Sequence, residues 1–171
     1  MTDSKKESTT VLNDLCASVA RSGAIKLLQQ EWVAAMGTGS PLSCIVVRIK
    51  RMQLVSEAYG RDAVDAALYE VASRLRACFV RRELLCSLGG GSFLVICPGS
   101  TPECALKMAS AIEARVASGL FACREGTLDL KVSCGVATAD CDTVDPGGLI
   151  RAVEHQLLRM QSQGDGRGAA A

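Results

Sequence analysis

Leu88-Gly89-Gly90-Gly91-Ser92-Phe93 is the stretch that decides the fold, because it has the form of a β-hairpin turn. Residues 84–88 and 93–97, on either side of it, are short apolar runs that predict two adjacent strands. Three glycines allow turn conformations that other residues avoid. They also let a ligand approach the backbone closely, since no Cβ stands in the way. The hairpin is therefore the first candidate for a binding site.

The sequence outward from the hairpin predicts alternating helices and strands. Cys44–Val47 is a continuous apolar run, typical of a strand buried on both faces, and residues 128–136 alternate like one long strand. Thr101-Pro102 and Asp145-Pro146 are helix start signals. Apolar residues at helical spacing predict helices over 20–36, 61–79, 101–118 and from 145 to at least 160.

This order of elements predicts an α+β fold in which helices are layered on a mostly antiparallel sheet. We expect one domain over residues 13–164, with a flexible segment over 1–12 and a flexible tail over 165–171. In the first helix, Ile25, Leu28, Trp32 and Met36 are expected to share the buried face.

Composition excludes several classes of protein. The 171 residues carry a net charge of +1, which predicts no bulk attraction to nucleic acid or to an anionic membrane. The polar N-terminus lacks the apolar core of a signal peptide, so we expect a cytoplasmic protein. Most of the nine cysteines stand where small apolar residues belong, and we interpret them as reduced and buried. Redox sensing is the alternative, carried by exposed Cys16, Cys123 or Cys141.

Further markers, in the same order along the chain, resemble the GGDEF domain family of diguanylate cyclases. They are Gln30-Glu31-Trp32, Ala58-Tyr59-Gly60, residues 131–137 (KVSCGVA) and Gln163-Gly164. With the hairpin they cover nearly all of residues 13–164. The resemblance implies a cyclase palm-like fold with a ferredoxin-like core and a sheet of about five strands. It also implies condensation of two GTP molecules into cyclic di-GMP, assisted by a divalent metal held by carboxylates.

The chain departs from the family pattern where the resemblance places that metal. Arg48 stands for the first strand-end aspartate, Lys50 for the second, and Gly91 and Ser92 for the acidic signature positions. An arginine cannot ligate a metal, and a glycine has no side chain. We therefore expect no metal and no cofactor. The chain is predicted to be a degenerate GGDEF domain, a pseudoenzyme and not an enzyme.

The resemblance also implies a remnant nucleotide site. Ser56 replaces the asparagine that contacts guanine, Asp65 matches its companion aspartate, and Gln161 and Asp165 replace two basic residues. Val80 and Glu83 stand at the ends of the family's inhibitory motif, which we interpret as an exposed charged corner; the alternative is cyclic di-GMP binding there through Arg81 or Arg82. The predicted nucleotide-binding residues are Arg48, Lys50, Ser56, Asp65, Gly89, Gly90, Gly91 and Ser92.

Three functions remain open at this point. The first is a regulatory or binding module in bacterial signalling that binds GTP, cyclic di-GMP or a signalling protein. The second is a purely structural module for protein interaction or homodimerisation, without nucleotide binding. The third is a residual nucleotidyl-transfer enzyme that uses other carboxylates, such as Glu57, Asp62 or Asp65.

Overall fold

The central element of the fold is a four-stranded antiparallel sheet. The computed structural model describes residues 3–80, 83–124, 126–139 and 145–164. The sheet has the order β2-β3-β1-β6, and β4 and β5 form a separate two-stranded hairpin. The strands are β1 (Leu42–Ile49), β2 (Leu84–Gly89), β3 (Ser92–Pro98), β4 (Phe121–Cys123), β5 (Gly126–Leu128) and β6 (Val132–Ala139). The helices are α1 (Asp3–Thr38), α2 (Met52–Arg76), α3 (Pro102–Ala117) and α4 (Pro146–Gly164).

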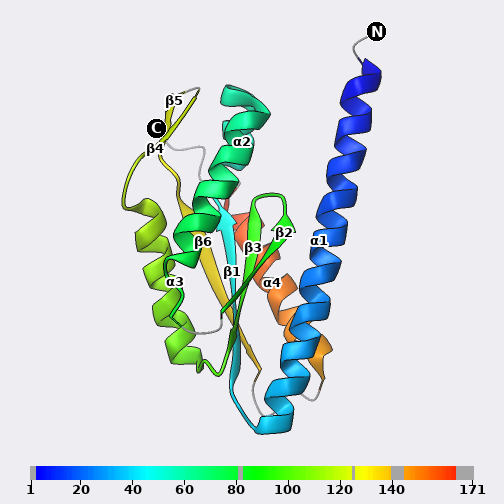
Figure 1. Ribbon diagram of the computed structural model, residues 1–171, viewed down its shortest axis with the longest axis vertical. Coiled ribbons are helices and arrows are strands. Elements are labelled where there is room, and N and C mark those ends of the chain that lie inside the picture. Colours follow the sequence, from blue (N-terminus) through cyan, green and yellow to red (C-terminus); the bar gives the residue numbers. More distant parts are fainter. Residues whose placement is uncertain (1–2, 81–82, 125, 140–144, 165–171) are drawn as a thin grey trace.

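Two pairs of helices cover the two faces of the sheet, so the domain has three layers (Figure 1). Helices α2 and α3 pack on one face, and α1 and α4 pack on the other. Strand β1 is buried on both faces: Ile45 and Val47 contact the α2–α3 layer, while Cys44 and Val46 contact the α1–α4 layer. Burial on both faces explains the uninterrupted apolar run of this strand. The predicted α+β class and the predicted hairpin are confirmed.

Several details differ from the sequence prediction. The central sheet has four strands, not about five. Residues 128–136 are not one strand: Leu128 pairs with Phe121 in the small hairpin, and β6 begins at Val132, which pairs with Ile49 at the end of β1. Because β1 ends there, the chain before Val132 has no strand of the central sheet beside it. The alternation of buried leucines nevertheless continues across the break, through Leu128 and Leu130.

The helices also depart in part from their predicted limits and faces. Helix α1 begins at Asp3 and extends well past the sheet (Figure 1), so it is longer than the predicted 20–36. Met36 is 41% exposed, and Ala35 takes the buried position in the last turns of α1. Helix α2 ends at Arg76 and is broken at Gly60 (φ 80°), which matches the predicted turn before the helix at 61. The domain limits at residues 12 and 164 remain predictions.

The two predicted helix starts are present. Thr101 is the N-cap of α3, and its hydroxyl accepts a hydrogen bond from the Cys104 backbone N–H. At α4, the Gly148 N–H donates to Asp145 Oδ1 at 2.7 Å. In the part of the chain that the structure describes, no helix has both the length and the apolar character needed to cross a bilayer.

Gly135 allows α4 to pack closely against β6. A Cβ at this position would lie 2.6 Å from Gln156 Oε1 and 2.7 Å from Met160 Cε, both on α4. Such distances require the helix or its side chains to shift. By contrast, a Cβ at Gly23, on the exposed side of α1, meets no atom within 4 Å.

We predict that Gly135→Ala lowers the free energy of unfolding by about 1–3 kcal/mol, because it overpacks the α4–β6 contact. The control Gly23→Ala is expected to be neutral or to stabilise the helix by up to about 1 kcal/mol. Urea denaturation followed by circular dichroism measures both values. Equal effects of the two substitutions would contradict the close-packing role of Gly135.

The cysteines of the core are protected thiols. Cys44 and Cys97 are buried, and burial raises the pKa of both, that of Cys97 to about 12. Burial, with the nearby Glu113, raises the pKa of Cys134 to about 12. Cys123 was expected to be exposed, but it is half-buried and its Sγ lies 3.2 Å from the Gly126 carbonyl. Cys104 is exposed, although it was not predicted as a candidate for redox sensing. The side chains of Cys16 and Cys141 lie outside the described residues.

We predict that stability falls as pH rises above about 9, since unfolded thiols ionise near pKa 8.5 while the buried ones keep their protons. Each such thiol contributes at most about 1.4 kcal/mol per pH unit. Urea denaturation at pH 8 and pH 10 measures the loss. It should be smaller in Cys97→Ala and unchanged in the exposed control Cys104→Ala. A Cys97→Ala loss equal to that of the unmodified chain would show that this thiol does not contribute.

Candidate functional site

The hairpin turn between β2 and β3 is built on left-handed backbone. Gly89, Gly90 and Gly91 have φ values of 79°, 58° and 76°. Side chains are strained at such angles, so the glycines are required by the shape of the turn. A Cβ at Gly90 would meet no atom within 4 Å, which leaves its surroundings open. A Cβ at Gly91 would lie 3.5 Å from Met52, the first residue of α2.

Two contacts join this turn to the end of β1. The Ile49 backbone N–H donates to the Gly91 carbonyl at 2.9 Å. Arg48 pairs in register with Ser92, and its Nη1 lies 3.5 Å from the buried Ser92 Oγ. This contact places the guanidinium of Arg48 beside the glycine turn. Arg48, Ser92 and the three glycines, all predicted as site residues, form one group in the structure.

Lys50 and Arg51 follow directly after β1 and are both exposed. The Lys50 N–H donates to the Lys131 carbonyl at 2.8 Å, which ties this segment to the residue before β6. Arg51 has a φ of 58° and is the one non-glycine residue with positive φ among the described residues. The end of β1 thus carries three basic side chains within four positions.

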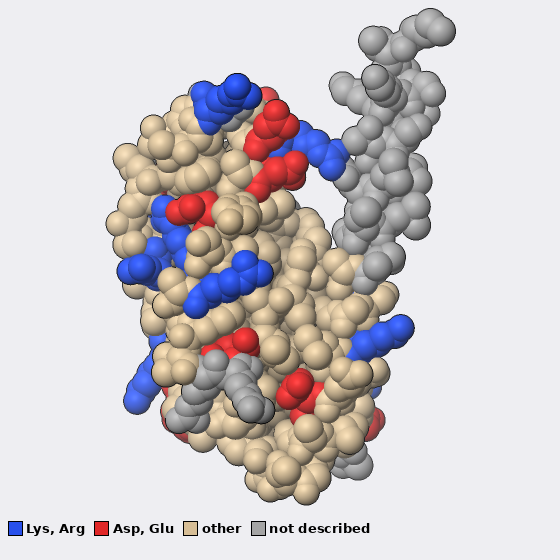
Figure 2. Space-filling model, in the orientation of Figure 1, with Lys and Arg blue, Asp and Glu red and all other residues tan. Residues whose placement is uncertain are grey.

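This positive charge is local. Over the face shown in Figure 2, basic and acidic side chains are interspersed, as the net charge of +1 implies. The molecule therefore offers no broad basic surface on this face. A small anion would be attracted by the strand end itself.

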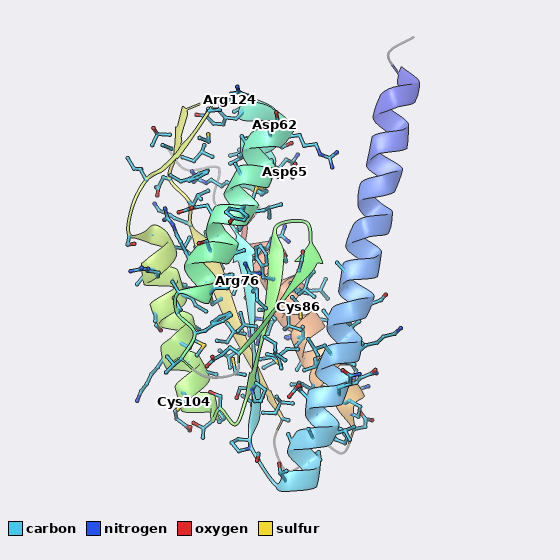
Figure 3. All side chains as sticks on the ribbon, in the orientation of Figure 1. Asp62, Asp65, Arg76, Cys86, Cys104 and Arg124 are labelled. Carbon is cyan, nitrogen blue, oxygen red and sulfur yellow. The ribbon has the colours of Figure 1, made fainter. Side chains whose placement is uncertain are left out.

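The structure does not unite all of the predicted residues. Ser56 is exposed and lies before the Gly60 break in α2, while Asp65 lies after it. Figure 3 shows Asp65 near Asp62 on α2, and the ion-pair partner of Asp65 is Arg61, at 4.0 Å on the same helix. Because the recorded partner of Asp65 lies on its own helix, the predicted guanine contact stays a prediction.

Other predicted positions cannot be placed. The side chain of Gln161 lies outside the described residues, and so do Asp165 and both arginines of the 80–83 corner. Val80, which begins that corner, is 84% exposed.

Sequence reasoning missed two neighbours of the site. Met52 packs beneath Gly91, and Lys131 accepts the hydrogen bond of Lys50. The available signals were weak: Met52 lies ahead of the helix predicted over 61–79, and Lys131 lies within residues 128–136, which were predicted as one strand. Both contacts depend on the folded arrangement of segments distant in sequence.

The strand end does not fit a divalent cation. Magnesium requires hard oxygen ligands, whereas Arg48 offers only N–H donors and Gly91 has no side chain. Among the described residues there is no group of three or more His, Cys, Asp or Glu side chains that could hold a metal. The same groups fit an anion, because guanidinium and ammonium groups donate to phosphate or carboxylate oxygens.

Comparisons with known proteins agree with this architecture. Residues 19–167 match the family model described as "Diguanylate cyclase, GGDEF domain". The chain is 28% identical over 128 residues to the response regulator PleD of Caulobacter vibrioides, covering 74% of this chain and 28% of PleD. It is 27% identical over 130 residues to the diguanylate cyclase DgcM of Escherichia coli, covering 75% of this chain and 30% of DgcM. The chain therefore spans less than a third of these relatives.

Solved structures show the same fold. The GGDEF domain of DgcB from Caulobacter crescentus, solved in complex with c-di-GMP, superposes with a TM-score of 0.76 at 18% identity. The superposition covers 84% of this chain and 83% of that one. At this identity the likeness concerns the fold alone.

These findings contradict the prediction that the chain is not an enzyme. The matched family is named for diguanylate cyclase, and the Escherichia coli relative is itself a diguanylate cyclase. The prediction rested on Arg48 and Gly91, which stand where the resemblance places the metal-binding carboxylates. The side chains at two positions do not by themselves decide whether the domain is catalytically active. With most of its length matched to that family model, the chain belongs to the GGDEF domain family.

Proposed function

We propose that this domain binds a guanine nucleotide, GTP or cyclic di-GMP, at the β2–β3 hairpin and acts as a binding and regulatory module of a cyclic di-GMP signalling protein. One observation carries the proposal. The Arg48 guanidinium is held beside Ser92 at a turn made of three left-handed glycines. This combines a cation beside the turn with backbone that a ligand can approach.

The chemistry of the turn favours a phosphate. A guanidinium presents planar, paired N–H donors that match phosphate oxygens, and hydrogen bonds to charged groups are stronger than neutral ones. Lys50 and Arg51 add positive charge within the same short segment. The open surroundings of Gly90 leave room for a ligand at the turn.

Relatives support the choice of ligand class. Family membership implies handling of guanine nucleotides, and the DgcB domain was solved with c-di-GMP. Ser56 and Asp65 are proposed to contact the base.

A protein-interaction module remains the second candidate. Val33 on α1 is 62% exposed, and α1 extends well past the sheet (Figure 1). A diguanylate cyclase of this fold, SiaD, has been solved in complex with its activator SiaC. The partner could be such a signalling protein or a second copy of the chain.

We predict that Arg48→Gln weakens binding of GTP or cyclic di-GMP by about tenfold or more, because a charged hydrogen bond contributes about 1.5–3 kcal/mol. Isothermal titration calorimetry measures the affinity. The matched control is Arg76→Gln, which removes an exposed arginine from the last turn of α2 (Figure 3).

Equal loss in the two variants would mean that overall charge, and not the hairpin site, controls binding. If the unmodified chain binds neither nucleotide, the nucleotide proposal fails and the protein-interaction module becomes the better account.

A further inference from the structure

We propose that the hairpin site binds the nucleotide phosphates as a metal-free anion, with Arg48 supplying the positive charge that a divalent cation would bring elsewhere in the family. This inference rests on the proposed function, since it names the ionic form of the ligand that the same site takes. It starts from the misfit between the residues at the end of β1 and any magnesium ion.

Neither β1 nor the hairpin turn provides a carboxylate ligand for a metal ion at their junction. Arg48 pairs with Ser92, and its neighbour Ile49 donates to the Gly91 carbonyl, so Arg48 and Gly91 both lie at the junction between β1 and the turn. Neither residue offers an oxygen ligand from its side chain. A cation placed between them would be repelled by Arg48, by Lys50 and by Arg51, which all lie within four positions of the chain.

The same geometry leaves donors for a phosphate. A guanidinium has five N–H groups, and the recorded contact with Ser92 Oγ, at 3.5 Å, is long and engages only one nitrogen. The half-buried position of Arg48 strengthens its interaction with an anion relative to a fully solvated side chain. Arg48 is also preorganised, because β1 is paired on both sides up to this residue.

The choice of ligand depends on whether the protein or a metal ion supplies the positive charge. Magnesium bound to a nucleoside triphosphate neutralises part of its negative charge and occupies phosphate oxygens. A site that supplies its own cations therefore binds the free triphosphate at least as well as the magnesium complex. A site whose carboxylates hold a metal ion binds the magnesium complex more tightly than the free triphosphate.

The test is a pair of calorimetric titrations of the chain with GTP, one in EDTA and one in magnesium chloride, at matched ionic strength. We expect the affinity in EDTA to equal or exceed that in magnesium. Binding that is tighter in magnesium, or that requires it, overturns the metal-free inference while the proposed function stands. Absence of binding in both GTP titrations and in a third titration with cyclic di-GMP overturns the proposed function itself.

A charge-reversal variant sharpens the assignment to Arg48. Arg48→Asp is expected to abolish GTP binding in EDTA and to leave only magnesium-dependent binding, whereas the control Arg76→Asp, with the same change of charge, keeps the metal-free binding. Circular dichroism checks that both variants fold. If Arg48→Asp is unfolded, Arg48→Gln takes its place in the EDTA titration. Unchanged metal-free affinity in a folded Arg48 variant overturns the role of this residue.

Discussion

Burial of β1 on both faces is the constraint on which the rest of the structure depends. Six consecutive residues, Leu42–Val47, are buried, because helices cover both sides of the sheet and strands pair on both edges of β1. The buried run tolerates a polar side chain where a partner satisfies it, as at Ser43, whose hydroxyl donates to the Ser100 carbonyl at 2.8 Å. The first position of β1 that is not fully buried is Arg48, at the end nearest the glycine hairpin. The candidate site lies where the core ends.

The hairpin completes this site through its backbone and not through its side chains. Positive φ at three successive glycines brings the turn close to β1, and the Ile49–Gly91 hydrogen bond fixes the junction. Family members are expected to hold a metal here with carboxylates. In this chain the same junction carries Arg48 and Gly91, so its charge is reversed while its shape is retained. We propose an anion site from that reversal, whereas the catalytic capacity of the domain does not follow from it in either direction.

Much of the fold could be predicted from local patterns. The hairpin, the doubly buried β1, the Thr101 cap and the break at Gly60 each depend on residues close together in sequence. The errors came where tertiary contacts decide. Residues 128–136 are divided between two sheets because β1 ends at Ile49. The alternation of apolar residues over 128–136 does not reveal where β1 ends. The grouping of Arg48 with Ser92 was predictable from strand pairing, but the place of Met52 beneath Gly91 was not. The prediction that the chain is not an enzyme was wrong for a different reason. It inferred the absence of catalysis from the residue types at only two positions, Arg48 and Gly91.

The most direct test of the account is a crystal structure of the chain with GTP bound in the presence of EDTA. We predict phosphate oxygens within about 2.7–3.2 Å of the Arg48 guanidinium nitrogens, next to the Gly89–Gly91 turn. A triphosphate bound elsewhere, or bound at the turn without contact to Arg48, would contradict the claim that the end of β1 is an anion site.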